Sequence, residues 1–353
     1  GAGHAYVQPV SGVVANLAMY TARTRPGDTM MCLSIPCGGH ISMGKEGMGG
    51  TAGAVHGLTI EYWPFDEKRM NIDVDAAVKK LREVKPKLAL FGGSVFLFPH
   101  PVRELADVAR EVGAYVGYDA AHVSGLIAGG QFQHPLREGV DIMTCSTHKT
   151  LPGPQHGMIL CRRELAEAVN RAVFPGVVSN HHLHSMAALA VALAEMMEFG
   201  REYAAQIVKN ARALGRAMYE RGLDVLCPDL GFTSSHTVVV SVTKYGDGGE
   251  IEKKLESANI ILNRNLLPWD IREGRNYKRP GGIRLGTSEV TRIGMKEREM
   301  EEIAEFIKRV VIDGESTQRI AQEVSEFRKD YQKLHYCFDS AAEAYEYIAL
   351  KKF

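Results

Sequence analysis

Short apolar runs alternate with amphipathic segments over the first two-thirds of the chain. The runs are apolar at consecutive positions, which is typical of strands in a sheet that is covered on both faces. They lie at residues 29–35, 57–63, 87–92, 114–119, 141–146 and 157–161. The segment from Pro101 to Gly113 has a helical pattern, because Val102, Leu105 and Val108 fall on one face. This alternation predicts an α/β domain with a mostly parallel sheet.

The pattern changes after about residue 163. Two long helical segments, 184–200 and 202–222, come first. Strands are then predicted at 222–227, 236–243, 259–263 and 282–287, and helices at 249–259 and 295–311. This mixture predicts a smaller α+β domain attached through a long helix. We divide the chain into a large domain at 1–205 and a small domain at 206–353, with a charged helical tail from Glu315 whose Tyr331, Leu334, Tyr336 and Phe338 pack on the body.

Composition narrows the class of protein without choosing a function. The 353 residues include 45% hydrophobic and 24% charged residues, and 42 Lys and Arg balance 42 Asp and Glu. These values are those of an ordinary globular protein and do not favour a nucleic-acid partner. The six cysteines form no Cys-x-x-Cys pair, so we expect neither a metal site nor a disulfide scaffold, and we expect a cytoplasmic location. We also expect no signal peptide and no membrane partner.

Polar side chains stand where several predicted strands end. Ligands of open α/β sheets bind beyond the carboxyl ends of the strands. The residues at these ends are His40, Ser94, Asp119, His122, Ser146, Thr147, His148 and Lys149. In addition, Ser11 and Gly12 precede a predicted helix, and free N–H groups at a helix N-terminus favour an anion. These positions predict one pocket with a phosphate site, an amine, a carboxylate and imidazoles.

These residue types fit pyridoxal phosphate. Lys149 would form a Schiff base with the aldehyde, and Asp119 would pair with the ring nitrogen. His40 would stack on the ring, and Ser94 would bond the phenolic oxygen. Each position also has an ordinary structural explanation: the aspartate and the Ser-Gly pair as caps, the histidine in a loop, the lysine at the surface. Spacing alone leaves both interpretations open.

Longer strings of residues point to a family. The strings "YVQPVSGVVANLAMY", "GGHIS", "VGYDAAHVSGLIAGG", "STHKTLPGP", "AVFPG" and "GGIRLGTSEVTRIGM" resemble serine hydroxymethyltransferase, in order from about Val7 to the helices after residue 295. The string around Lys149 is the most specific. The resemblance implies a fold-type I pyridoxal-phosphate enzyme with a mostly parallel seven-stranded sheet. It also implies an obligate homodimer whose active sites lie at the subunit interface. Whether two such dimers associate into a tetramer is left open.

The resemblance also implies roles for single residues. Lys149 carries the cofactor, His148 lies beside it near the phosphate, and Asp119 pairs with the pyridinium. His40 stacks on the ring, and His122 is the second histidine of the Asp-x-x-His motif. The other implied contacts are Ser11, Gly12 and Ser146 in the cofactor site, Ser94 at the phenolic oxygen, Arg284 at the substrate carboxylate, and Asn265 at the pteridine.

The sequence departs from the family pattern at several positions. Val13 stands where "SGSQAN" has a hydroxyl, Gln155 where "GPRGG" has an arginine, and Met43 where "GGHLTHG" has a histidine. The family's "PGGQGG" reaches a phosphate across the dimer; here it reads "PGVVSNHH", where Asn180 or His181 could substitute. The family also has an N-terminal arm with a tyrosine and a glutamate that act across the interface. The printed sequence begins just upstream of the "VQP" motif, and we expect full activity to need that arm.

The resemblance implies a reaction and leaves alternatives. The expected activity is reversible transfer of a one-carbon unit between serine and glycine, with tetrahydrofolate or a related tetrahydropterin as acceptor. The same cleavage without a pterin would give a threonine-type β-hydroxy-amino-acid aldolase or transaldolase, since one fold hosts several chemistries. An inactive dimeric scaffold is the third possibility. The set of Lys149, Asp119, His40 and Arg284 argues against it.

Overall fold

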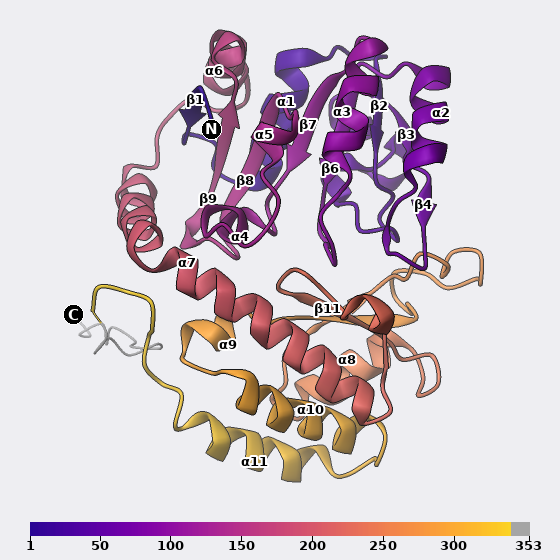
Figure 1. Ribbon diagram of the computed structural model, residues 1–353, viewed down its shortest axis with the longest axis vertical. Coiled ribbons are helices and arrows are strands. Elements are labelled where there is room, and N and C mark those ends of the chain that lie inside the picture. The colour runs from indigo at the N-terminus through magenta and orange to yellow at the C-terminus, as the bar shows by residue number, and fades with distance from the viewer. Residues whose placement is uncertain (340–353) are drawn as a thin grey trace, which may run out of the picture.

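The computed structural model describes residues 1–339 and consists of two layered units joined by one long helix (Figure 1). The first unit is built on a seven-stranded sheet in the order β1-β9-β8-β7-β6-β2-β3. Its strands are β1 (His4–Tyr6), β2 (Thr29–Cys32), β3 (Thr59–Tyr62), β6 (Leu88–Gly92), β7 (Tyr115–Asp119), β8 (Ile142–His148) and β9 (Pro152–Cys161). The neighbouring strands β3, β2, β6, β7 and β8 are parallel, β9 is antiparallel to β8, and β1 is antiparallel to β9. The predicted mostly parallel sheet is confirmed.

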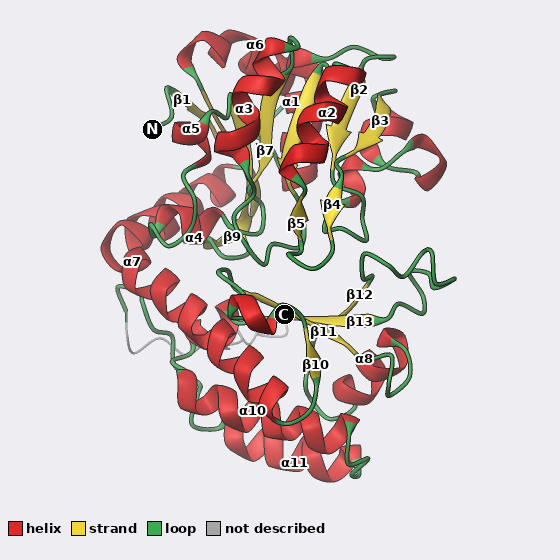
Figure 2. Cartoon of the chain, turned by 45° about the vertical axis from the view of Figure 1, so that its right-hand side comes forward, coloured by secondary structure: helices red, strands yellow, loops and turns green. Residues whose placement is uncertain are grey.

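Helices cover both faces of this sheet (Figure 2). They are α1 (Gly12–Arg23), α2 (Val74–Val84), α3 (Val102–Glu111), α4 (Ser124–Ala128), α5 (Pro135–Glu138) and α6 (Ala166–Arg171). Alternate residues of β6 point to opposite sides. Leu88 and Leu90 join the core that contains α1, whereas Ala89 and Phe91 join the core that contains α3. This alternation is why the strands read as continuous apolar runs.

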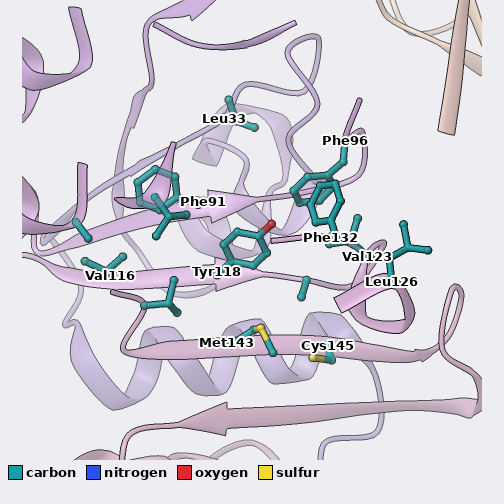
Figure 3. Close-up of a cluster of buried hydrophobic side chains, with 14 of the residues drawn as sticks. Leu33, Phe91, Phe96, Val116, Tyr118, Val123, Leu126, Phe132, Met143 and Cys145 are labelled. Carbon is teal, nitrogen blue, oxygen red and sulfur yellow. The ribbon is translucent and has the colours of Figure 1, made fainter. Parts of the chain in front are cut away.

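The core on the α3 side is rich in aromatic side chains (Figure 3). Phe91 is fully buried and its ring stacks on that of Trp63 at 5.0 Å between centroids. Tyr118 is also fully buried, and its hydroxyl donates to Oε1 of Gln133 at 2.8 Å. Burying one such side chain contributes about 1.5 to 3 kcal/mol. This core fixes β6 and β7, whose carboxyl ends carry part of the site.

The second unit has an antiparallel sheet in the order β10-β11-β13-β12. Its strands are β10 (Asp224–Val225), β11 (Thr237–Ser241), β12 (Asn263–Asn265) and β13 (Gly282–Gly286). Its helices are α8 (Gly248–Glu256), α9 (Ser288–Arg292), α10 (Glu297–Val311) and α11 (Thr317–Arg328). The strand predicted at 259–263 is wrong in position, because Asn259 has a φ of +60° in the turn after α8 and the strand starts only at Asn263.

Shorter elements complete the chain. A two-stranded ribbon joins β4 (Phe65–Asp66) to β5 (Asn71–Ile72). Short 3₁₀ or π segments lie at Ile41–Met43, Glu46–Met48, Thr51–Val55, Arg163–Leu165, Ala172–Val177 and Pro228–Leu230.

The two helical segments predicted around Gly200 form a single helix, α7 (Leu183–Glu220). Gly200 is buried inside it, and the backbone of Gly129 approaches so closely that an added Cβ on Gly129 would lie 2.4 Å from the Gly200 carbonyl oxygen. The missing Cβ of Gly129 allows this close approach, and Gly200 does not end the helix. Residues of α7 up to Val208 belong to the first core, and residues from Ala211 onward belong to the second.

Length and composition alone would allow α7 to cross a membrane. In the structure, Leu189 and Met196 of this segment are buried in the first core. The tail also lies against this region, since the ring of Phe338 meets that of Phe199 and Tyr336 meets Tyr203. The predicted packing of the tail is confirmed for these two residues. The remainder of the predicted tail, 340–353, lies outside the described residues.

Candidate active site

A small cavity of 180 Å³ lies where β7 and β8 end and α1 begins. Every residue that the sequence assigned to the cofactor lines this cavity, except Ser94. The ends of parallel strands meet at one edge of the sheet, which is why residues far apart in the chain come together here.

The N-terminus of α1 forms one wall of the cavity. Ser11 is the N-cap, and its Oγ accepts the backbone N–H of Val14 at 3.2 Å. Gly12 follows and packs against Ser146; a Cβ built on Gly12 would lie 2.5 Å from Ser146 Oγ. The side chain of Val13 lines the same wall and offers no hydroxyl. The free N–H groups of the first turn still favour an anion at this end.

Asp119 ends β7 as a buried carboxylate with 3% of its surface exposed. It accepts hydrogen bonds from Asn16 Nδ2 at 2.8 Å and from the backbone N–H of Ala121 at 3.0 Å. Among residues 1–339 it forms no ion pair, although a buried charge normally has a cationic partner. A protonated ring nitrogen in the cavity would supply that partner.

Lys149 follows β8 and lines the same cavity. Burial lowers the pKa of its amine, Asp119 opposes this shift, and Arg284 adds to it. Its amine has no hydrogen-bond partner within the described chain. The neighbouring His148 has a buried Nδ1 without a hydrogen-bond partner in the described structure, and burial lowers the pKa of its imidazole. An amine with a depressed pKa beside an unpaired imidazole nitrogen suits a site that holds a reactive ligand.

His40 lies between the small cavity and a second, larger one, and it lines both. It is the N-cap of the short segment Ile41–Met43, and its Nδ1 lies 2.8 Å from Ser42 Oγ. Burial lowers the pKa of His40; Asp119 raises it, and Lys149 and Arg284 lower it further. The imidazole is therefore neutral near pH 7.

A pair of stacked imidazoles borders the cavity. The ring of His122 stacks on that of His236 with 5.7 Å between centroids and 22° between planes. Burial lowers the pKa of His122 well below its ordinary value and lowers the pKa of His236 to about 3. Sequence reasoning missed His236, because a histidine before an apolar strand resembles many structural histidines. His122 lines this side of the cavity, and His236 stacks on its ring.

The larger cavity is a cleft of 1060 Å³ between the two units. Arg284 on β13 reaches it, donating to the Ser94 carbonyl at 3.2 Å and to Asn263 Oδ1 at 3.3 Å. Burial lowers the pKa of the Arg284 guanidinium. Asn265 also lines the cleft, and its Nδ2 donates to the Leu266 carbonyl at 2.7 Å. Ser94 thus lies in the cleft, next to the arginine, and not in the small cavity.

The residues that depart from the family pattern have definite places. Gln155 lines the small cavity, so an amide stands there in place of a guanidinium. Met43 is buried in the core on the α1 side and does not face either cavity. The backbone carbonyl of Asn180 accepts from Gln8 Nε2 at 3.2 Å, and His181 is exposed.

The cavity fits pyridoxal phosphate. The unpaired buried carboxylate of Asp119 matches a ring cation, and the amine of Lys149 matches the aldehyde. Gly12 and Ser146 line the cavity beside the N-terminus of α1, where free N–H groups favour a phosphate. Sequence reasoning did not select three residues that contact the site: Asn16 donates to Asp119, Ser42 lies within hydrogen-bond distance of His40, and His236 stacks on His122.

Comparisons with known proteins identify the family of this chain. The family model for serine hydroxymethyltransferase matches residues 2–307. Serine hydroxymethyltransferase of Nitrosopumilus maritimus is 55% identical over 350 residues, which cover 98% of this chain and 80% of that protein. That of Korarchaeum cryptofilum is 57% identical over 348 residues, with 97% and 80% covered. That of Methanocaldococcus jannaschii is 55% identical over 351 residues, with 98% and 80% covered.

A solved structure is also similar over nearly the whole chain. The crystal structure of L-threonine transaldolase from Pseudomonas fluorescens superposes with a TM-score of 0.86 at 31% identity, covering 98% of this chain and 77% of that one. The predicted fold-type I pyridoxal-phosphate architecture is confirmed. The family match and the curated relatives together settle the assignment: the chain belongs to the serine hydroxymethyltransferase family.

Proposed function

We propose that this protein is a pyridoxal-phosphate-dependent serine hydroxymethyltransferase, which moves a one-carbon unit reversibly between serine and glycine. The observation that carries the proposal is that the cavity with Lys149 and Asp119 meets the cleft with Arg284 at one shared residue, His40. A cofactor in the first space and an amino acid with its acceptor in the second would therefore touch. Curated relatives named serine hydroxymethyltransferase at 55–57% identity favour this activity over the aldolase alternative.

The residues of the small cavity divide the work of holding the cofactor. When bound, pyridoxal phosphate supplies an aldehyde that condenses with amines and a ring that accepts electrons. Lys149 holds the aldehyde, and its lowered pKa keeps more of the amine neutral and nucleophilic. Asp119, a buried carboxylate that forms no ion pair within residues 1–339, would hold a proton on the ring nitrogen. The first turn of α1 holds the phosphate.

Residues at the cleft orient the amino acid. Arg284 has a planar guanidinium on a rigid strand, and such a group binds a carboxylate through two parallel hydrogen bonds. Because it is largely buried, this pair is stronger than one in bulk water. Fixing the carboxylate would set the orientation of the amino acid beside the bound cofactor. That orientation would favour cleavage of the Cα–Cβ bond.

We assign the one-carbon acceptor, tetrahydrofolate or a related tetrahydropterin, to the rest of the cleft. Its walls are mostly apolar, with Ile41 and Tyr62 on one side and Asn265 on the other. An amide such as Asn265 can pair with the donor and acceptor edge of a pteridine. The volume of 1060 Å³ is ample for a ligand of that size.

We also propose a homodimer in the cytoplasm. Large apolar side chains are exposed along one segment of α7, with Leu183 72%, Val191 56% and Met197 89% exposed. Exposed apolar groups of this kind mark association surfaces, and a second copy of the chain is the occupant we assign. The six free cysteines suit a reducing compartment. Sedimentation velocity of the purified protein tests the dimer, which a single species of monomer mass would refute.

The experiment that tests the function compares serine cleavage with and without tetrahydrofolate after reconstitution with pyridoxal phosphate. We expect a visible absorption band of the bound cofactor and pterin-dependent formation of glycine. Lys149→Ala should abolish the covalent attachment and lower kcat by about 10²-fold or more. Lys79→Ala, at an exposed lysine of α2, is the matched control and should change neither.

Threonine cleavage distinguishes the second candidate. Should threonine be cleaved faster than serine while the pterin changes neither rate, the aldolase activity replaces the proposed one. A protein that binds no pyridoxal phosphate at all would refute both enzymes.

A further inference from the structure

A chain of hydrogen bonds joins Asp119 to His40 through two buried residues. Asn16 Nδ2 donates to Asp119 Oδ2 at 2.8 Å and to Ser42 Oγ at 3.0 Å. Ser42 Oγ lies 2.8 Å from His40 Nδ1. Asn16 is 2% exposed and Ser42 is fully buried, so water does not compete for these bonds. Neither Asn16 nor Ser42 has a role in the mechanism described above.

The direction of each hydrogen bond in this chain follows from chemistry. The Asp119 carboxylate can only accept, so the amide nitrogen of Asn16 must face it. Thr144 Oγ1 donates to Asn16 Oδ1 at 2.6 Å, which agrees with this orientation of the amide. Both hydrogens of the Asn16 amide are therefore donated, one of them to Ser42 Oγ. The hydroxyl hydrogen of Ser42 remains free to donate to His40.

His40 receives two hydrogen bonds on one ring nitrogen. Besides the hydroxyl, the backbone N–H of Ser42 donates to His40 Nδ1 at 3.1 Å. A backbone N–H has no lone pair, so Nδ1 must be the unprotonated nitrogen. A neutral imidazole carries its single proton on the other nitrogen, Nε2. Within the described chain, Nε2 makes no hydrogen bond, and His40 lines both cavities.

We propose that Ser42, held by Asn16 and Asp119, fixes His40 as the Nε2–H tautomer, so that His40 acts as a hydrogen-bond donor and not as a base. With Nδ1 occupied by two donors and Nε2 protonated, the ring has no free lone pair for the proton of a substrate hydroxyl. The titratable and charged groups near His40 are Asp119, Lys149, Arg284 and His122. The tautomer follows from the contacts alone, whereas its part in catalysis rests on the proposed function.

Nuclear magnetic resonance of the protein labelled with ¹⁵N at its histidine rings tests the tautomer directly. The signals of His40 are identified by their loss in His40→Asn. We expect an unprotonated Nδ1 and a protonated Nε2 between pH 7 and pH 8, with the cofactor bound and without it. A protonated Nδ1 in the native protein would overturn the proposal. Because the measurement needs no turnover, a protein that fails to transfer the one-carbon unit can still show the stated tautomer.

Substitutions at Ser42 test the cause. Ser42→Ala removes one of the two donors to Nδ1, so we expect a measurable fraction of the Nδ1–H tautomer and a fall in kcat/KM of about 3- to 10-fold. Ser42→Thr keeps the hydroxyl and should therefore retain the Nε2–H tautomer and the native kcat/KM. Ser257→Ala removes an exposed hydroxyl near the end of α8 and is the matched control. A Ser42→Ala variant with an unchanged tautomer and unchanged kcat/KM would overturn the role of Ser42.

The pH dependence of kcat/KM tests whether His40 acts as a base. His40→Asn should lower kcat/KM while leaving the shape of the pH profile unchanged, because the wild-type ring neither gains nor loses a proton in the reaction. Disappearance of an acidic limb in this variant would overturn the assignment of His40 as a donor.

Discussion

Replacing Gly12 by alanine tests how tightly the α1 N-terminus packs against β8. The added Cβ would lie 2.5 Å from Ser146 Oγ and 3.7 Å from Ser146 Cβ. The first distance is a clash, whereas the second is an ordinary contact. Only the Ser146 hydroxyl must therefore move. The substitution occupies space in the wall of the cavity to which we assign the cofactor phosphate.

Two effects on stability oppose each other. Alanine favours a helix over glycine by at most about 1 kcal/mol, and by less at the first helical position. Overpacking costs about 1 to 3 kcal/mol. Because Ser146 can rotate, the lower part of that range applies, and we expect a net loss of about 1 kcal/mol. Displacing one charge-assisted hydrogen bond to the phosphate costs about 1.5 to 3 kcal/mol, so the dissociation constant for pyridoxal phosphate should rise about 10- to 100-fold.

Urea unfolding and a cofactor titration followed by visible absorbance measure the two quantities. The double-mutant cycle with Ser146→Ala is the control, because removing the hydroxyl removes the atom that clashes. Gly12→Ala should cost about 1 kcal/mol less stability when it is combined with Ser146→Ala than when it is made in the native protein. Equal costs in the two backgrounds would refute the steric argument. A cofactor dissociation constant unchanged by Gly12→Ala would refute the assignment of the phosphate.

Three further predictions concern stability and are measured by urea unfolding. Phe91→Ala should lower the free energy of unfolding by about 3 to 5 kcal/mol, because it leaves a cavity in the aromatic core. Phe338→Ala, at a side chain that is 60% exposed, is the control and should lower it by under about 1 kcal/mol. Similar losses in the two variants would contradict the core assignment. Burial lowers the pKa of His100 from 6.5 to about 3, so the unfolded chain takes up a proton below pH 6.5 that the folded one refuses, and stability falls as the pH drops from 6.5 toward 3. This histidine should contribute about 2 kcal/mol of that loss between pH 6.5 and pH 5, and His100→Gln should remove it; an unchanged slope would be inconsistent with a neutral buried ring. Glu195→Gln should lower the free energy of unfolding by about 1 to 3 kcal/mol, because the Arg292 guanidinium lies 2.6 Å from this carboxylate and both side chains are only 13–14% exposed. A double-mutant cycle with Arg292→Met that shows no coupling energy would exclude the ion pair as the cause.

Most strands and the residues at their ends could be predicted because each leaves a local signal. A buried parallel strand is a continuous apolar run, and a polar side chain directly after it stands out. Gly200 was misleading because a glycine is a common local signal of a helix end, whereas α7 continues through this residue and its carbonyl packs against Gly129. Asn16 and Ser42 give no signal either. Asn16 lies among apolar residues of α1, and its partners are distant in the chain, so its function becomes visible only when the strands and helices are assembled.

Because α7 runs without a break through both units, it affects how the two units dock during folding. The walls of the interdomain cleft come from residues 34–95 of the first unit and from residues 264–284 of the second. Neither unit forms the cleft alone, so the cleft exists only after both units have folded and packed against α7. A ligand that occupies the cleft therefore binds only the fully docked molecule and stabilises it by mass action. Ligand-dependent protection of the amide hydrogens of α7 would report this final docking step separately from the formation of either core.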